Sequence, residues 1–175
     1  AIGMEAADWF IPGYWLWARI IETLGGVGYD NNLAQMFGYD WRLGFPMGHL
    51  RDKTMTRLKQ MVELGKEAAD GKKAVIITHS MGSNLILYFI QKMEHDHPGW
   101  TDENVHAIVT LAGPWLGAIK DIAAIVSGEM KDTTQLGPLE PIVEKVLSRA
   151  QRRDMFRSWG SLGSLYPKGG RAVWG

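Results

Sequence analysis

A serine at position 80 stands between an apolar run and an amphipathic pattern, within the segment Thr78-His79-Ser80-Met81-Gly82. A serine hydroxyl presented on a tight turn between a buried strand and a helix can attack an ester carbonyl. The backbone N–H of the next residue, Met81, points to the same place, where the start of the helix adds positive dipole. We therefore predict that Ser80 is a catalytic nucleophile and that Met81 supplies an oxyanion-hole donor.

The turn around Ser80 needs small residues two positions before and two positions after the serine. Gly82 meets this requirement, whereas Thr78 stands where the usual motif has glycine. The alternative, in which Ser80 only caps the following helix, stays open. His79 points to the opposite face of the strand from Ser80, so we expect it to be packed or hydrogen-bonded below the turn and not to act as the base.

Two apolar runs predict the strands that would position this serine. Residues 74–77 are apolar and mostly β-branched, which is typical of a fully buried parallel strand, and residues 105–112 form a second such run. Between them, residues 81–94 have helical spacing. The inner face of that helix is expected to carry Leu85, Tyr88, Phe89 and Met93. Strands that alternate with helices favour an α/β fold, with a mostly parallel sheet and helices on both faces.

The remaining patterns predict further elements and no boundary between domains. We expect a short strand at residues 35–39, a loop at residues 44–46, and loops over the last 20 residues, which hold many Gly and Ser. Apolar residues at helical spacing predict four more helices, over residues 12–24, 51–69, 119–126 and 139–150.

The composition is that of an ordinary globular domain, with 175 residues, 46% of them apolar and 22% charged. Lys and Arg together number 19, as do Asp and Glu, so no basic field would attract nucleic acid. There is no apolar run of about 18 residues, which a membrane-spanning helix would need. The absence of cysteine excludes disulfides and thiolate metal sites.

Several motifs resemble the lecithin:cholesterol acyltransferase family, namely residues 37–43 (FGYDWRL), 78–82 (THSMG) and 112–117 (AGPWLG). Others are similar to its phospholipid:diacylglycerol acyltransferase branch, namely residues 5–10 (EAADWF), 12–15 (PGYW) and 166–170 (YPKGG). A residue other than glycine at position 78 also fits that branch. The resemblance extends over nearly the whole chain and is weakest between residues 118 and 158.

The resemblance implies a serine acyltransferase with the α/β-hydrolase fold. Ser80 would take an acyl group from a phospholipid and pass it to diacylglycerol, giving triacylglycerol without a cofactor. It also implies an endoplasmic-reticulum enzyme that acts on the lumenal side and is anchored to the membrane by another segment. Two alternatives stay open: a lipase or phospholipase A of the same fold, and a non-catalytic lipid-binding remnant.

The general base expected for Ser80 is missing from the downstream sequence. In this fold the acid and then the base follow the nucleophile, usually far downstream. After Ser80 the only histidines are His95, His97 and His106, all within 26 residues of it. We therefore expect residues 1–175 to be the central fragment of one α/β-hydrolase domain, with residues 74–95 as the region of the serine turn.

The rest of the catalytic apparatus is then expected outside this chain. By resemblance, this apparatus consists of the triad Asp and His and the second oxyanion donor. The resemblance also implies one more strand, which would lie in the sheet between the strands at residues 36–39 and 74–77 and would come from another part of the protein. We expect residues 1–175 in isolation to be unstable and inactive.

Two tryptophans are candidates for substrate contact because each follows a predicted strand at the rim that would carry Ser80. These are Trp41 and Trp115, for which a purely structural role stays open. Next to Trp41, Asp40 and Arg42 are expected to pair and brace the loop.

Two further segments have competing interpretations. Residues 118–158 form either a lid over the acyl site or a surface cap. Residues 94–97 (EHDH) contain metal-ligating residue types, but their place before Pro98-Gly99 favours a solvated helix end, and we predict no metal site.

Overall fold

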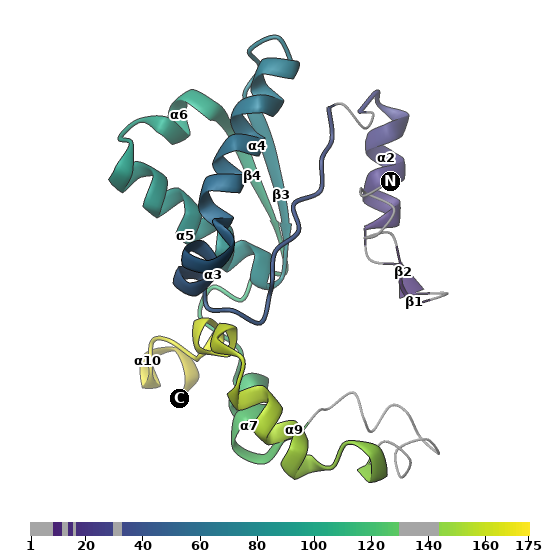
Figure 1. Cartoon of the computed structure of the whole chain (residues 1–175), viewed down its shortest axis with the longest axis vertical. Helices are drawn as coiled ribbons and strands as arrows, with labels where there is room; N and C mark the ends of the chain where they lie inside the picture. Colours follow the sequence, from purple (N-terminus) through teal and green to yellow (C-terminus); the bar gives the residue numbers. More distant parts are fainter. Residues whose placement is uncertain (1–8, 12–13, 16, 30–32, 130–143) are drawn as a thin grey trace.

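The computed structural model describes residues 9–11, 14–15, 17–29, 33–129 and 144–175, and the statements below concern these residues (Figure 1). The elements that position Ser80 are the strands β3 (Ala74–His79) and β4 (Val105–Leu111), joined through the helices α5 (Met81–Asp96) and α6 (Trp100–Asn104). The two strands are parallel and stay in register from Val75 opposite Ala107 to His79 opposite Leu111. The predicted parallel strands and the helix between them are therefore confirmed.

Helix α6 is an element that the sequence patterns do not predict. Its N-cap, Gly99, has a φ of +87°, which glycine adopts without strain. The carboxylate of Glu94 accepts hydrogen bonds from the backbone N–H groups of Gly99 (2.9 Å) and Thr101 (2.8 Å). Hydrogen bonds from Thr101 and Gly99 lower the pKa of Glu94, so this carboxylate stays ionised as a cap between the two helices.

Helices α3 (Phe45–Asp52) and α4 (Thr54–Ala68) replace the single helix expected over residues 51–69. Lys53 separates them with a left-handed backbone (φ 54°, ψ 33°). The expectation of a loop at residues 44–46 is wrong, because Pro46 lies in the first turn of α3. Proline suits that position, since its fixed φ is helical and its missing N–H would have had no partner there.

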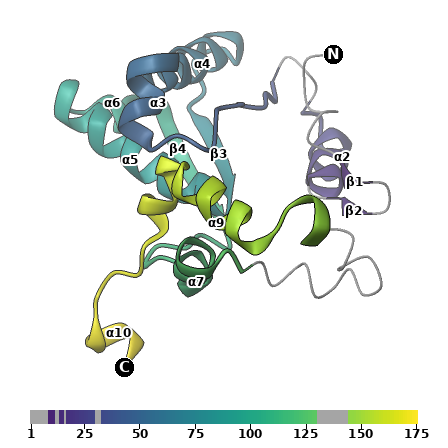
Figure 2. The ribbon, with the colours of Figure 1, turned by 60° about the horizontal axis from the view of Figure 1, so that its bottom comes forward.

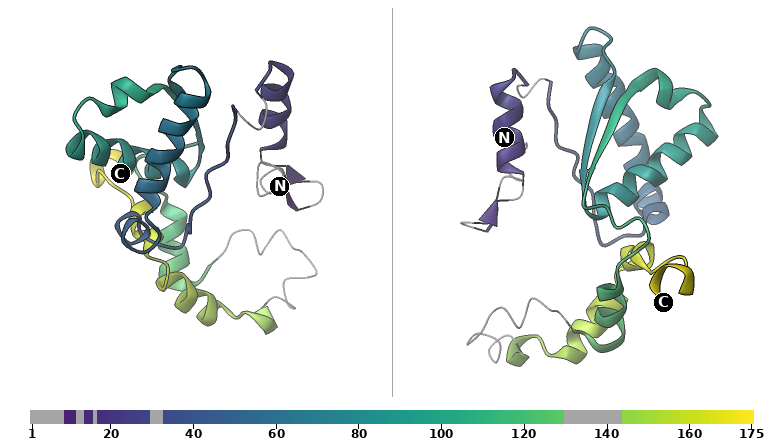
Figure 3. Two further views of the ribbon diagram at one scale, coloured as in Figure 1. Left: turned by 45° about the horizontal axis from the view of Figure 1, so that its top comes forward. Right: turned by 180° about the vertical axis from the view of Figure 1, so that it is seen from behind.

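The core lies on one face of the β3–β4 pair, beneath α4 and α5. Seen from behind, the two strands lie in front of these helices (Figure 3). Phe89 and Trp100 pack edge to face at its centre, with ring centroids 5.3 Å apart. The buried apolar residues of this cluster are Phe45, Met55, Leu58, Val62, Leu85, Ile86, Phe89, Met93 and Trp100. Three of the four residues expected on the inner face of α5 are thus fully buried, and Tyr88 is half-buried.

The expectation of helices on both faces of the sheet does not hold for the described residues. On the face away from α4 and α5, Val75 and Val109 are 48% and 43% exposed. Residues 35–39 are extended but belong to no strand. A strand satisfies its backbone groups only by pairing with a neighbour, and none of the described residues pairs with this segment.

The N-terminal segments lie apart from this core in all views (Figures 1 and 3). Strands β1 (Trp9–Ile11) and β2 (Tyr14–Trp15) pair antiparallel, and α2 (Ala18–Gly26) follows them. The helix expected over residues 12–24 therefore begins later, at Ala18. Aromatic residues such as Tyr14 and Trp15 favour strands, and here they pair with β1 and do not open the helix.

The C-terminal elements lie beyond the carboxyl ends of β3 and β4 (Figure 2). They are α7 (Ile119–Ser127), α9 (Arg149–Arg157), the 3-10 helix η2 (Gly160–Leu165) and α10 (Arg171–Trp174). The prediction of α7 is confirmed, whereas the expectation of loops over the last 20 residues is wrong. None of the described helices has both the length and the apolar character needed to cross a bilayer.

The helix expected over residues 139–150 is only partly testable, since residues 139–143 lie outside the described part of the chain. Residues 144–146 are helical. The expected helix does not continue to residue 150, because Ser148 is the N-cap of the next helix, α9. The hydroxyl of Ser148 accepts the N–H of Gln151, whose side chain in turn accepts the N–H of Ser148, so the two residues form a capping box.

Candidate functional site

Ser80 occupies the junction between β3 and α5, as the sequence predicts. Its backbone (φ 51°, ψ −128°) lies in a region that L-residues rarely adopt. Such a conformation persists only when the surroundings hold it, and strained residues of this kind cluster at active sites. The backbone N–H of Ser80 donates to the carbonyl of Leu111 at 2.9 Å, which fastens the turn to the end of β4.

The side chain of Ser80 is partly exposed and does not cap α5. The alternative in which this serine serves only as a helix cap is therefore contradicted. Met81 is the first residue of α5, so its backbone N–H has no acceptor within the helix. A hydroxyl and an unpaired N–H thus meet at one helix start, an arrangement that suits attack on an ester and stabilisation of the resulting oxyanion. The catalytic roles of both residues remain predictions.

Thr78 has a definite place beneath the turn. Its hydroxyl lies 2.9 Å from the hydroxyl of Ser83, and both residues are buried. A Cβ added at Gly82 would lie 3.8 Å from the Cβ of Thr78, which is an ordinary contact. The small residue expected at position 82 is therefore less strictly required here, and a threonine at position 78 fits because it hydrogen-bonds to α5.

The loop after β4 is held against the first turn of α5. A Cβ added at Gly113 would lie 2.7 Å from the Cβ of Ser83, so only glycine permits this approach. The buried Asn84 donates from Nδ2 to the carbonyl of Pro114 at 3.1 Å. The sequence pattern does not point to Ser83 and Asn84, because no local pattern says which loop packs on that turn. The Gly113-Pro114 pair was the only signal that the chain turns there.

Trp115 follows this loop and is 41% exposed. The next residues pair with the C-terminal segment: the N–H of Ala118 donates to Leu165 and the N–H of Lys168 to Leu116, both at 2.8 Å. Residues 165–168 therefore lie beside the loop that follows β4. The contact of Trp115 with substrate stays a prediction.

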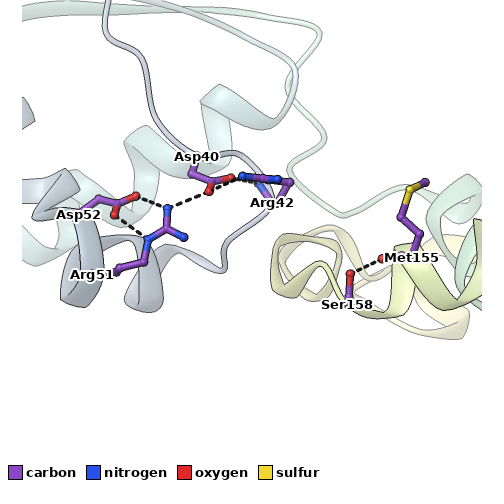
Figure 4. Close-up of polar contacts among 6 residues, drawn as sticks. All are labelled: Asp40, Arg42, Arg51, Asp52, Met155 and Ser158. Carbon is purple, nitrogen blue, oxygen red and sulfur yellow. Dashed lines mark hydrogen bonds and ion pairs between the residues drawn. The ribbon is translucent and has the colours of Figure 1, made fainter.

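Asp40 braces the loop that carries Trp41 (Figure 4). Its carboxylate accepts two hydrogen bonds of 2.9 Å from the guanidinium of Arg42, one of 3.2 Å from the backbone N–H of Arg42, and one of 2.8 Å from Arg51, which also binds Asp52. The guanidinium groups of Arg42 and Arg51 hold the pKa of Asp40 well below its usual range. The predicted pairing of Asp40 and Arg42 is confirmed, and Arg51 is an additional partner that the sequence did not indicate.

A pocket of about 300 Å³ lies between α7, α9 and η2. Trp159 forms part of its wall and packs edge to face against Trp41 (4.8 Å between centroids) and Phe156 (5.2 Å). Trp41 is 49% exposed and supports this wall without lining the pocket. At the end of α9, Ser158 donates to the carbonyl of Met155 at 2.6 Å (Figure 4).

The histidines after Ser80 are placed away from it. His106 lies at the amino end of β4, opposite the carboxyl end where Ser80 follows β3. His95 lies fifteen residues along α5 from Ser80, or roughly 22 Å at 1.5 Å per residue, and its side chain is 87% exposed. His79 contacts Trp17 edge to face (6.3 Å between centroids) and makes no hydrogen bond to Ser80. The side chain of His79 remains exposed, because Trp17 is the one ring contact that the described residues make with it on that face of β3.

Residues 94–97 form the predicted solvated end of α5. His95 pairs with Asp96 at 2.9 Å, Lys92 binds the same carboxylate, and Glu94 caps α6. Among the described residues, no group of three or more His, Asp or Glu side chains is arranged to hold a metal ion.

Comparisons of the sequence with known proteins identify the family of this chain. The sequence model of the lecithin:cholesterol acyltransferase family matches residues 1–175. The chain is 40% identical to the phospholipid:diacylglycerol acyltransferase of Saccharomyces cerevisiae over 183 residues, which cover 100% of the chain and 28% of that protein. It is 41% identical to the Schizosaccharomyces pombe protein of the same name, with 100% and 28% covered.

A more distant relative is the lysosomal phospholipase A and acyltransferase of Mus musculus, which is 29% identical over 80% of the chain and 31% of its own length. The chain spans less than a third of each of these relatives. Because the family match covers every residue, the chain belongs to the lecithin:cholesterol acyltransferase family.

Proposed function

We propose that the protein carrying this chain transfers a fatty acyl group from a phospholipid to diacylglycerol, giving triacylglycerol. The observation that carries this proposal is the strained Ser80, whose hydroxyl is free of the helix cap and lies beside the unpaired N–H of Met81. The names of the fungal relatives support the choice of donor and acceptor.

The reaction proceeds in two halves. The hydroxyl oxygen of Ser80 attacks the ester carbonyl, the bond to the glycerol oxygen breaks, and the lysophospholipid leaves with the proton of the serine. A hydroxyl oxygen of diacylglycerol then attacks the carbonyl carbon of the acyl-serine, the bond from that carbon to the serine oxygen breaks, and the proton of the attacking hydroxyl returns to Ser80, which releases triacylglycerol. The N–H of Met81 stabilises the oxyanion in both halves.

The remaining parts of the apparatus are proposed to lie elsewhere in the whole protein. These are the triad Asp and His, the second oxyanion donor and the rest of an α/β-hydrolase sheet, of which residues 1–175 form the central fragment. Residues 118–158 act as a lid, and Trp41 and Trp115 contact the substrate. The enzyme acts at the lumenal face of the endoplasmic-reticulum membrane.

The test is transfer by the full-length protein from phosphatidylcholine labelled in its acyl chain, with and without added diacylglycerol. We expect labelled triacylglycerol only when diacylglycerol is present. Ser80→Ala should lower this rate by about 10³-fold or more, whereas Thr23→Ala, at an exposed threonine of α2, should not change it. Free fatty acid formed equally in both conditions would contradict transfer and favour hydrolysis.

A further inference from the structure

The pocket between α7, α9 and η2 combines apolar and aromatic walls with a single cation. Its lining residues are Ile125, Phe156, Arg157, Trp159, Gly160, Leu162, Gly163 and Tyr166. Apolar walls of this kind take hydrocarbon, and the few polar groups among them decide what else the ligand must carry. Among the residues that the structure describes, Arg157 is the only charged one in that lining.

Arg157 differs from the other arginines of its helix. Three of the four arginines in α9 have a carboxylate partner: Arg149 with Glu129, Arg152 with Glu144 and Arg153 with Asp154. Arg157 instead donates from Nε to the carbonyl of Ile125 at 2.9 Å and forms no ion pair with the described residues. That bond anchors the guanidinium to α7 and leaves its two terminal nitrogen groups available to a ligand.

A guanidinium with two unused donor groups fits the oxygens of a phosphate. Beside it, Trp159 is held between the rings of Trp41 and Phe156, so this wall is rigid before any ligand binds. A ligand that satisfies both features has a phosphate next to hydrocarbon. The charge and the walls together therefore match a phospholipid better than a neutral glyceride.

The pocket also lies at the same end of the sheet as Ser80. Helices α7 and α9 and η2 lie beyond the carboxyl ends of β3 and β4 (Figures 1 and 2). The hydrogen bond from Ala118 to Leu165 joins the end of η2 to the loop after β4, and the last residue of β4, Leu111, accepts the N–H of Ser80. We propose that this pocket binds the phosphate diester of the phospholipid donor through Arg157, an inference that rests on the proposed function.

The experiment measures binding in the full-length protein with Ser80→Ala as the background, so that no turnover is needed. The probes are a diether phosphatidylcholine, which cannot be cleaved, and a diether glycerol, which has no phosphate, each titrated by surface dilution in detergent micelles. Arg157→Gln keeps a donor for Ile125 but removes the charge. It should weaken binding of the diether phosphatidylcholine about tenfold, as expected for a hydrogen bond to a charged group, and should leave the diether glycerol unchanged.

One matched control and one independent pair of variants accompany Arg157→Gln. Arg149→Gln removes an exposed arginine of the same helix and should change neither affinity. A Cβ added at Gly163 has no atom within 4 Å, so Gly163→Glu can place a carboxylate in the pocket wall while the bond from Arg157 to Ile125 remains. Gly163→Glu should reproduce the selective loss, and Gly163→Gln should not. This pair keeps the test decisive even where Arg157→Gln fails to fold.

Three outcomes would overturn the inference. Unchanged affinity in Arg157→Gln and Gly163→Glu, or an equal loss for both probes, would mean that the pocket does not recognise phosphate. Displacement of the diether phosphatidylcholine by millimolar inorganic phosphate would indicate a site for free phosphate. Because these measurements use the Ser80→Ala background, their result is independent of whether the active protein transfers its acyl group to diacylglycerol or to water.

Discussion

Ser80 and Gly113 belong to one close contact between the start of α5 and the loop after β4. Ser80 is fastened by its N–H to Leu111, and Gly113 lies against Ser83 in the first turn of the helix. The strain at Ser80 is therefore supported by bonds and packing from a second strand. Individual residues in this contact can be tested by small changes of volume or of hydrogen bonding.

Gly113→Ala should destabilise the protein by about 1–3 kcal/mol, because its methyl group would lie 2.7 Å from the Cβ of Ser83 and the surroundings must shift. Urea unfolding of the full-length protein measures this. Gly163→Ala is the matched control, since a Cβ there has no atom within 4 Å. Equal stability of the two variants would mean that the loop after β4 does not pack on α5 as closely as described.

Thr78→Val removes the buried hydrogen bond to Ser83 and keeps the shape of the side chain. We expect a loss of about 1 kcal/mol in the free energy of unfolding, because the hydroxyl of Ser83 loses its partner. Thr78→Ser retains the hydroxyl and should recover most of that hydrogen-bond contribution. A Thr78→Val variant as stable as the wild type would contradict this role for the threonine.

Asp40 provides a test by pH. Arg42 and Arg51 lower the pKa of Asp40 in the folded chain, so its ion pairs stabilise the fold fully above the ordinary pKa of about 4. That contribution is lost as the pH falls from there toward the lower folded pKa. Asp40→Asn should therefore flatten the decline of Tm between about pH 5 and pH 2. High salt should reduce the difference between the variants, and identical pH profiles at low salt would count against the ion pairs.

At the scale of elements, the packing of α9 on α7 depends on one buried arginine. Arg152 is 1% exposed and donates to the carbonyls of Gly128 (3.0 Å) and Leu147 (2.8 Å) as well as to Glu144. These three acceptors lie at the end of α7 and just before α9. The pocket that carries Arg157 is built between the same two helices, so its shape follows from this packing.

Arg152→Met should loosen this pair of helices, because it leaves the carbonyls and Glu144 without their donor. Breaking a buried pair in this way costs about 3 kcal/mol or more. Hydrogen exchange in α7 should accelerate while exchange in α5 stays unchanged. Arg149→Met is the control because its ion pair is exposed. Acceleration that reaches α5 equally would mean that the C-terminal helices and the β3–β4 core unfold as one unit.

At the scale of the whole molecule, the described chain has one well-packed face and one open face. Helices α4 and α5 cover one side of β3 and β4, while Val75 and Val109 on the other side are about half-exposed. Apolar strand residues normally pack against another layer in an α/β protein. That this part of the chain does not work by itself therefore stays a prediction, which the open face of the strand pair motivates.

Residues 1–175, purified alone, should therefore have no esterase turnover and only marginal stability. The reasons are the exposed apolar face and the absence, within the described residues, of a histidine bonded to Ser80. Hydrolysis of a soluble chromogenic ester and thermal unfolding measure the two properties. Turnover by this fragment that disappears with Ser80→Ala would show that a base is present within it.

The local pattern of residues was sufficient to locate β3, β4, α5 and α7 and to place Ser80 at a strand-to-helix junction. Apolar spacing and β-branched content are properties of short segments, and those segments keep their preferred structure in the fold. The pair of Asp40 and Arg42 was also predictable, because the two residues are only two positions apart.

Contacts between distant segments were decided only by the tertiary structure. Residues 35–39 have a strand pattern, yet they form no ladder, since pairing depends on a neighbour that no local pattern specifies. The bond from Asn84 to Pro114 and the bond from Arg157 to Ile125 join residues 30 and 32 positions apart. Spacing along the chain carries no information about such contacts, so the packing behind Ser80 and the pocket that Arg157 lines became visible only once the chain was folded.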